Sequence, residues 1–141
     1  MEQCVFCEMI DGQGEITFVY QDEMVSAFMD IQPVNAGHIL VVPNEHATYL
    51  ADLSEETGAR LFQVAQRLAA ALRSSGLRCE GANFFLADGE AAGQEIFHVH
   101  FHVFPRFKSD GFGLTFADSY FTLPSRSDLE EAASAIRKQL G

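Results

Sequence analysis

Residues 98–103 read His98-Val99-His100-Phe101-His102-Val103, so that histidines alternate with apolar residues. Successive side chains of a β-strand point to opposite faces, and the alternation therefore predicts a strand over residues 97–105 with all three histidines on one face. The apolar residues between them would face the core. Because a buried imidazole is costly without a partner, we interpret the histidine face as a functional site and not as a solvated edge with chance histidines.

The spacing of the three histidines limits what they can do together. At roughly 3.3 Å per residue, His98 and His102 lie about 13 Å apart along a straight strand. One zinc ion, with bonds to nitrogen of about 2.0–2.1 Å, cannot collect all three. A neutral imidazole, however, attacks phosphorus well near neutral pH. His100 has an imidazole on each side, and one neighbour can donate a proton to a leaving group, so we predict His100 as the nucleophile.

Outward from this stretch, the chain predicts an α+β fold. Strands are expected at residues 16–20, 24–30, 38–42 and 83–86, and helices at residues 4–11, from Ser54 to Gly76, and after a capping box at residues 127–130. Short links between the early strands favour antiparallel pairing. The expected architecture is a mostly antiparallel five-stranded sheet with a long helix and a C-terminal helix, and we expect the helices to pack on one face of the sheet. Residues 111–125 contain no clear element, but their aromatic side chains predict an ordered loop that packs on the body or on a partner subunit.

The length and net charge of the chain limit the number of domains and the kinds of partner that it can have. The chain has 141 residues, of which 48% are hydrophobic, which suits a single domain over residues 1–141. The net charge of −11 disfavours nucleic acids and anionic membrane surfaces as partners, because both require basic side chains. No apolar run approaches the ~20 residues of a membrane helix, and the N-terminus lacks the basic and apolar regions of a signal peptide. We therefore expect a cytoplasmic protein, and a small phosphate ligand is compatible if donors gather locally.

Three stretches of the sequence resemble the histidine triad family. The run at residues 98–103 is similar to that family's motif, while residues 89–97 (GEAAGQEIF) and 33–46 (PVNAGHILVVPNEH) resemble segments of its bacterial members. They occur in the family's order, and the resemblance covers nearly the whole chain. It implies nucleotidyl transfer, in which a histidine attacks the α-phosphorus of a nucleotide and water then releases a nucleoside monophosphate.

The resemblance implies roles for the histidines of the motif. His100 would form the nucleotidyl-histidine intermediate, and the backbone carbonyl of His98 would orient it. His102 would contact the phosphate and help the leaving group depart. Relatives are commonly homodimers, and the long helix with the aromatic tail would serve such an assembly.

The resemblance also implies a nucleotide site outside the motif. Gln94 would hydrogen-bond the phosphate side, Asp30 would hold the ribose hydroxyls, and the remaining matches are Phe28 and Ile31 in the base pocket and His38 nearby. Each has a plainer interpretation: Asp30 as the start of a turn, Gln94 as a loop amide, and Phe28 and His38 as core residues.

Two neighbouring positions depart from the family's pattern. Ala87 stands where an amide side chain is usual, and Asp88 stands where Asn is frequent. A lost amide would weaken the grip on the sugar and phosphate. The departure bears on substrate preference and rate more than on the type of reaction.

The pair Cys4 and Cys7 forms a C-x-x-C motif with three interpretations: a structural zinc site, two empty thiols or a redox pair. A redox pair usually opens a helix after a strand, and no strand precedes this motif. Zinc needs two further ligands, and the resemblance implies that these are His46 and His98. Such a closed site would be structural, because no position remains for water.

Three functions follow from the sequence. The first is a hydrolase acting on dinucleoside polyphosphates, nucleoside phosphoramidates or related adenylates. The second is a nucleotidylyltransferase that passes the nucleotide to an acceptor other than water. The third is a nucleotide- or zinc-binding interaction module with little turnover.

Overall fold

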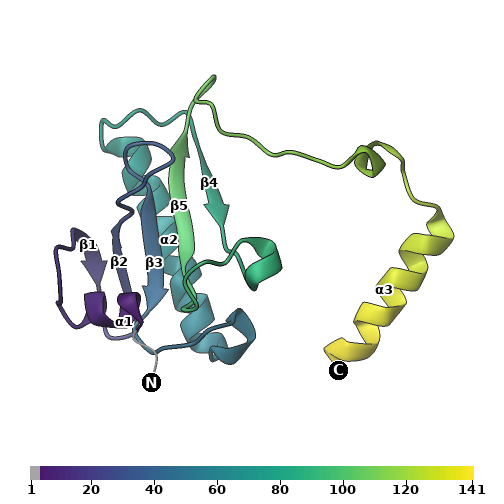
Figure 1. Ribbon diagram of the computed structural model, residues 1–141, viewed down its shortest axis with the longest axis horizontal. Helices are drawn as coiled ribbons and strands as arrows, with labels where there is room; N and C mark the ends of the chain where they lie inside the picture. The colour runs from purple at the N-terminus through teal and green to yellow at the C-terminus, as the bar shows by residue number, and fades with distance from the viewer. Residues whose placement is uncertain (1–3) are drawn as a thin grey trace. The chain divides into compact units, whose positions relative to one another are not determined.

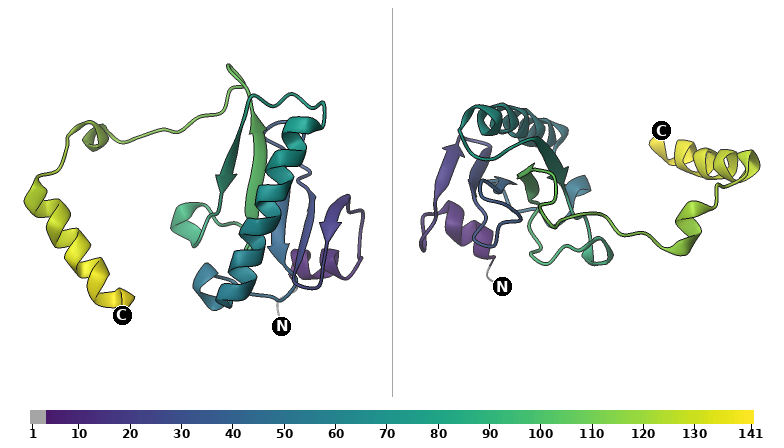
Figure 2. Two further views of the ribbon diagram at one scale, coloured as in Figure 1. Left: turned by 180° about the vertical axis from the view of Figure 1, so that it is seen from behind. Right: turned by 90° about the horizontal axis from the view of Figure 1, so that it is seen from above.

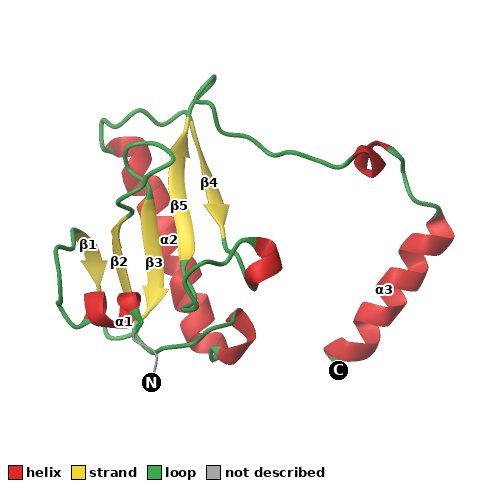
Figure 3. Cartoon of the chain, in the orientation of Figure 1, coloured by secondary structure: helices red, strands yellow, loops and turns green. Residues whose placement is uncertain are grey.

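The computed structural model describes residues 4–141 and divides into two units, the residues up to Asp110 and Gly111–Gly141. The first unit carries all five strands and the long helix (Figure 1; Figure 3 colours the elements by type). The elements in chain order are α1 (Val5–Ile10), β1 (Phe18–Gln21), β2 (Val25–Met29), β3 (Ile39–Pro43), the 3-10 turn η1 (Leu50–Asp52), α2 (Glu55–Ser74), β4 (Gly81–Phe85), η2 (Glu90–Ala92), β5 (Phe101–Arg106), η3 (Asp118–Phe121) and α3 (Arg126–Leu140).

The five strands form one sheet in the order β1-β2-β3-β5-β4, and every neighbouring pair is antiparallel. This confirms the α+β prediction of a five-stranded antiparallel sheet with a long helix and a C-terminal helix. β5, which the histidine stretch enters, lies between β3 and β4 and is therefore an inner strand. Among residues 4–141, no helix is both long and apolar enough to cross a membrane.

Helix α2 covers one face of the sheet, as Figure 2 shows from behind. Its N-cap is Ser54, whose side chain accepts a hydrogen bond from the Thr57 N–H, as the sequence predicts. Apolar side chains at helical spacing meet the sheet's alternate side chains in one core. That core contains Val25, Ala27, Ile39, Val41, Leu61, Val64, Ala65, Leu72, Val99 and Val103.

Helix α1 packs on the opposite face of the sheet. Phe6 joins Phe28, Leu40 and Val42 in a second cluster, and these strand residues alternate with those that face α2. The prediction that the helices pack on one face is therefore wrong for α1. The reason is that the inner strands are apolar on both faces, so each face needs a cover.

The histidine stretch only partly lies in a strand. The prediction of a strand over residues 97–105 is wrong at its start, because β5 begins at Phe101 and only His102 belongs to it. Phe101 pairs with Val41, and the same register continued would put Pro43 opposite Val99. Proline has no N–H with which to extend the ladder. The N–H of Val99 instead bonds to the carbonyl of Ala47 at 2.8 Å. The apolar residues of the stretch do face the core, as predicted.

The second unit, Gly111–Gly141, contains η3 and α3. η3 lies in a stretch for which no element was predicted, and Phe116 stacks on Tyr120 with ring centroids 3.9 Å apart. Helix α3 begins two residues earlier than the predicted capping box at residues 127–130 implies. Its N-cap is Ser125, which follows Pro124 and accepts a hydrogen bond from the Asp128 N–H at 3.0 Å. None of its 15 residues, all of them described, is buried.

Candidate functional site

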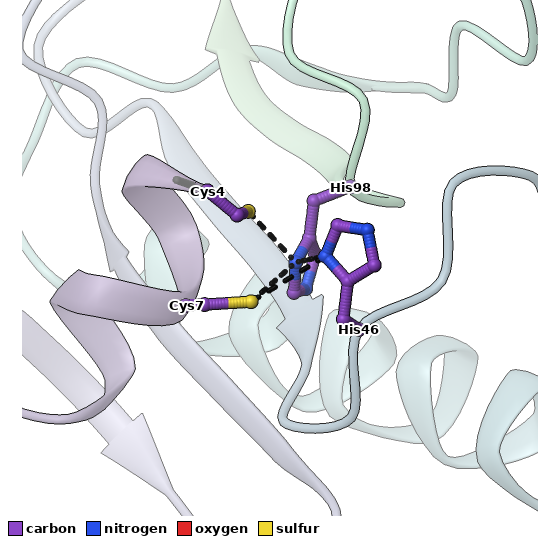
Figure 4. Close-up of side chains that lie close together, drawn as sticks. All are labelled: Cys4, Cys7, His46 and His98. Carbon is purple, nitrogen blue, oxygen red and sulfur yellow. Dashed lines mark hydrogen bonds between the residues drawn. The ribbon is translucent and has the colours of Figure 1, made fainter. Parts of the chain in front are cut away.

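Four potential metal ligands converge between α1 and the start of the histidine stretch (Figure 4). Cys4 is the N-cap of α1 and Cys7 lies within it, while His46 comes from the loop after β3 and His98 from the segment before β5. Sγ of Cys4 and Nδ1 of His98 are 3.4 Å apart, and Sγ of Cys7 and Nδ1 of His46 are also 3.4 Å apart. The two Nδ1 atoms lie 3.2 Å from each other. The structure thus brings together the four residues that the resemblance implied.

The donor set fits a tetrahedral zinc ion. Zinc bonds of about 2.0–2.1 Å to nitrogen and about 2.3 Å to sulfur place tetrahedral ligands roughly 3.3–3.8 Å apart, close to the separations found here. Nε2 of His98 lies 2.8 Å from the Pro43 carbonyl. A carbonyl can only accept, so Nε2 carries the proton and Nδ1 offers its lone pair to the cluster.

Burial, together with the neighbouring Cys4, raises the pKa of the Cys7 thiol to about 11. A reactive redox cysteine needs the opposite shift, because the thiolate is the nucleophile. A bound cation would favour the thiolate, which metal ligation requires. The charges around this pair therefore favour the metal interpretation over the redox interpretation.

The imidazole of His100 is held in one tautomer. Its Nδ1 lies 2.7 Å from the backbone carbonyl of His98, so Nδ1 donates and Nε2 keeps a free lone pair. The residue is 7% exposed, and its ring centroid lies 5.0 Å from that of His102. This arrangement offers Nε2 of His100 as a nitrogen nucleophile beside a second imidazole, an arrangement that phosphoryl chemistry can use.

A hydrogen-bond chain fixes the proton of His102. The Val34 N–H donates to Nδ1 of His38 at 3.0 Å, which leaves the proton of a neutral His38 on Nε2. That Nε2 lies 2.9 Å from Nδ1 of His102 and donates to it. The proton of neutral His102 is therefore on its Nε2. Neither the order of this chain nor the part of Val34 is visible in the sequence pattern.

Burial dominates the charge state of this pair. Burial, together with the neighbouring His100 and His38, lowers the pKa of His102 to about 4. Burial also lowers the pKa of His38, while the carboxylate of Asp30 opposes the shift. Both side chains are therefore neutral at pH 7 in the free protein.

Asp30 lies at the edge of this group. Its Oδ2 is 3.5 Å from Nε2 of His38, and its Oδ1 accepts a hydrogen bond from the Gln32 N–H at 2.8 Å. Asp30, His38 and His102 could hold a metal by distance alone. The Val34 N–H argues against this, because it uses the Nδ1 lone pair of His38 and so keeps a proton on the nitrogen that would bind the ion.

The other predicted nucleotide-binding residues fall in different environments. Gln94 is buried, and its amide donates to the carbonyls of Thr48 and Ile96 while accepting from the Gly89 N–H. Phe28 is 1% exposed within the cluster under α1, whereas Ile31 is 95% exposed. The structure brings together His100, His102, His38 and Asp30. The side chain of Gln94 instead joins the loop after β4 to the Thr48 carbonyl.

Ala87 and Asp88, the two positions that depart from the family's pattern, both contribute to the structure of this unit. Ala87 is 5% exposed. Oδ1 of Asp88 accepts a hydrogen bond from the Leu50 N–H at 2.9 Å, which ties the loop after β4 to η1.

Comparison with known proteins agrees with this fold and site. The sequence matches the HIT domain over residues 12–109. It is 38% identical over 143 residues to Protein hit of Bacillus subtilis (strain 168). That alignment covers 99% of this chain and 95% of the relative. The crystal structure of a member of the HIT family from Bacillus subtilis matches with a TM-score of 0.89 and 35% identity, covering 99% of each chain.

A further match is the crystal structure of a Zn-bound histidine triad family protein from Mycobacterium smegmatis. It has a TM-score of 0.75 and 36% identity, and the alignment covers 94% of this chain and 97% of that one. The fold and the histidine site therefore define this chain as a member of the HIT, or histidine triad, family.

Proposed function

We propose that this protein hydrolyses nucleotide phosphates through a nucleotidyl-histidine intermediate on His100. The observation that carries the proposal is the hydrogen bond of Nδ1 of His100 to the His98 carbonyl at 2.7 Å, which leaves Nε2 free to attack. Substrates of this class are dinucleoside polyphosphates, nucleoside phosphoramidates and related adenylates.

In the first half-reaction, Nε2 of His100 attacks the α-phosphorus and the bond from phosphorus to the leaving group breaks. His102 is neutral in the free protein, and the hydrogen bond that His38 donates to its Nδ1 keeps its proton on Nε2. That Nε2–H would donate a hydrogen bond to the leaving atom and so stabilise the charge that develops as the bond breaks. The leaving group departs as an anion or takes its proton from solvent.

In the second half-reaction, water attacks the same phosphorus from the side that the leaving group vacated. The proton of this water passes to solvent, the bond between phosphorus and Nε2 of His100 breaks with its electron pair returning to Nε2, and a nucleoside monophosphate leaves. Asp30 would accept hydrogen bonds from the ribose hydroxyls, and Phe28 and Ile31 would adjoin the base. For Gln94, we propose that it shapes the phosphate side through its loop, because its amide is already hydrogen-bonded.

The test is turnover of an adenosine phosphoramidate and of diadenosine polyphosphates, with the release of adenosine monophosphate followed by chromatography. His100→Ala is expected to lose all turnover. With a radiolabelled substrate and rapid acid-free quenching, the label is expected on His100 in the wild type and, more slowly, in His102→Gln. Wild-type rates in His100→Ala would overturn the proposal.

The same experiment separates the competing functions. Label that forms on the protein but passes to an added acceptor instead of water would indicate a nucleotidylyltransferase. Binding of a nucleotide without any label on the protein would indicate a binding module.

For the group of Cys4, Cys7, His46 and His98, we propose zinc as the bound ion. The two thiols and two imidazoles are a donor set that zinc prefers, and the related protein from Mycobacterium smegmatis is Zn-bound. When bound, the ion would tie α1 to the segment that presents the His98 carbonyl. Ligands of this kind must stay reduced, which fits a cytoplasmic protein.

We also propose that the protein forms a homodimer. Helix α2 exposes 62% of Phe62, and the second unit exposes large apolar side chains such as Phe121 at 77% and Ile136 at 62%. Exposed apolar surface of this extent is typical of interfaces. Light scattering coupled to size-exclusion chromatography is expected to give the mass of two chains, and a monomer mass would overturn this proposal.

A further inference from the structure

Phe6 lies between the two cysteines of the metal group and touches the predicted nucleophile. It is the buried residue of α1, with 4% of its surface exposed. Its ring centroid is 5.1 Å from that of His100 and 5.9 Å from that of His98, at interplanar angles of 75° and 84°. Near-perpendicular rings attract because the positive edge of one meets the negative face of the other.

The hydrogen bond to the His98 carbonyl does not by itself fix the ring of His100. One hydrogen bond at Nδ1 allows the ring plane to rotate about the donor–acceptor line, and Nε2 moves with it. Two ring contacts restrict this rotation: the contact with Phe6, and the contact with His102 at 63° and 5.0 Å. Small displacements of an attacking atom cost large factors in rate, so the ring plane matters for the reaction.

The position of Phe6 depends in turn on the metal group. Helix α1 has only six residues, and a helix this short has little stability of its own. Cys4 immediately precedes α1, and Cys7 directly follows Phe6 in the chain. Both cysteine sulfurs lie within 3.5 Å of Nδ1 of His98. An ion at this group would hold α1, and with it Phe6, against the histidines.

We propose that Phe6 is a positioning residue: it fixes the ring plane of His100 and transmits the occupancy of the metal group to the reaction centre. This inference rests on the proposed function for its kinetic consequence only. The mechanical link from α1 to His100 exists whether or not the chain turns over a nucleotide.

The first test compares two leucine substitutions. Phe6→Leu keeps apolar volume but removes the ring edge that faces His100. Phe18→Leu is the matched control, because Phe18 packs on Phe28 at 87°, much as Phe6 does at 60°, within the same cluster. With the zinc-loaded protein and an adenosine phosphoramidate, Phe6→Leu is expected to lower kcat on the order of tenfold with KM within about twofold. Phe18→Leu is expected to leave both constants within about twofold.

The second test does not need turnover. In the wild type, the Nδ1 proton of His100 is held by the His98 carbonyl and is expected to give a slowly exchanging NMR signal. Phe6→Leu is expected to speed its exchange with solvent at least several-fold, and Phe18→Leu is not. Removal of zinc from the wild type is expected to speed exchange in the same way, with little further change when zinc is removed from Phe6→Leu.

These outcomes separate the inference from the proposed function. If no substrate turns over but the NMR signal responds to Phe6→Leu and to zinc, the positioning proposal stands and the hydrolase proposal falls. Equal effects of Phe6→Leu and Phe18→Leu would mean general loosening of the cluster and would overturn the positioning role. A signal in the zinc-free wild type that matches the loaded protein would overturn the link to the metal group.

Discussion

Nε2 of His38 lies 2.9 Å from Nδ1 of His102 and donates its proton there. The bond decides which nitrogen of His102 faces the reaction, so a side chain that keeps a donor at this place should preserve function. We expect His38→Leu to lower kcat/KM by roughly 10² and His38→Gln, whose amide N–H can still donate, to lose much less. Nitrogen NMR of His102 is the direct readout: its single tautomer should become a mixture in His38→Leu. An unmixed tautomer there would show that His38 does not control it.

The buried histidines make the folded protein sensitive to acid. The pKa values of His38, His98 and His102 are all lowered, chiefly by burial, and that of His102 falls from 6.5 to about 4. The unfolded chain therefore binds more protons than the folded chain below about pH 6.5, and stability is lost as the pH falls from there toward 4. Thermal melts of the zinc-free protein at pH 7, 6 and 5 are expected to show falling midpoints. His102→Gln should show a shallower slope, and an equal slope would rule out His102 as a contributor.

Metal removal tests the role of the group around Cys7. Because the ion would join α1 to the histidine segment, chelation is expected to lower the melting temperature by several degrees or more while part of the turnover remains. Cys7→Ser should match the chelated wild type and should not respond further to chelator, whereas Cys79→Ser is the control outside the group. No zinc by elemental analysis, together with a melting temperature that chelation leaves unchanged, would contradict a structural metal.

Two glycines should respond to alanine in opposite directions. Gly37 has φ of +106°, and an added Cβ would lie 3.0 Å from Leu77 Cδ1 and 3.1 Å from Leu72 Cδ2. Gly37→Ala is therefore expected to cost about 1–3 kcal/mol of the free energy of unfolding. Gly58, inside α2 and with open space around its Cβ position, should gain roughly 0.5–1 kcal/mol as alanine. Denaturant unfolding measures both, and equal effects would contradict the geometry.

Asp22 is the centre of the link between β1 and β2. Burial raises its pKa, but hydrogen bonds from Tyr20, from the N–H groups of Val25 and Met24, and from Arg60 outweigh burial and hold the pKa well below its usual range. The ionised form is thus favoured by folding at neutral pH, and this contribution is lost only in strong acid.

We expect Asp22→Ala to lower the free energy of unfolding at pH 7 by about 2 kcal/mol, since it leaves two backbone donors without their acceptor. Its exposed neighbour provides the control: Glu23→Ala is expected to stay within about 0.5 kcal/mol of the wild type. A fall no larger than that of the control would mean that the link does not depend on Asp22.

The arrangement of the sheet and helices was predictable because it follows from periodicity. The apolar residues of α2 recur at helical spacing and Ser54 supplies an unambiguous N-cap, so the long helix could be placed from sequence. The start of β5 could not, because it depends on the register with β3, which pairs Phe101 with Val41 and would put Pro43, a residue without an N–H, opposite Val99. The start of α3 depends on a choice between Ser125 and Ser127, and pattern alone does not decide between two serines two residues apart.

The candidate site shows a similar division. The resemblance predicted which histidines form the site, and the structure brings His38, His100 and His102 together. It could not give their tautomers, which depend on backbone groups such as the His98 carbonyl and the Val34 N–H. Phe6 was also missed, since an aromatic residue between two cysteines carries no signal of its contact with a histidine more than 90 positions away.

His98 contributes its ring to the metal group and its carbonyl to His100. The carbonyl is present whatever the side chain, so evolution can change the ring at this position without deleting the group that orients the nucleophile. Among related sequences, histidine at position 98 should therefore be present where Cys4, Cys7 and His46 are present and absent where they are absent. Histidine at position 100 should instead be present wherever the protein catalyses the proposed reaction. A related chain that lacks all four residues of the metal group but keeps the histidine at position 100 would belong to a metal-free lineage with the same reaction.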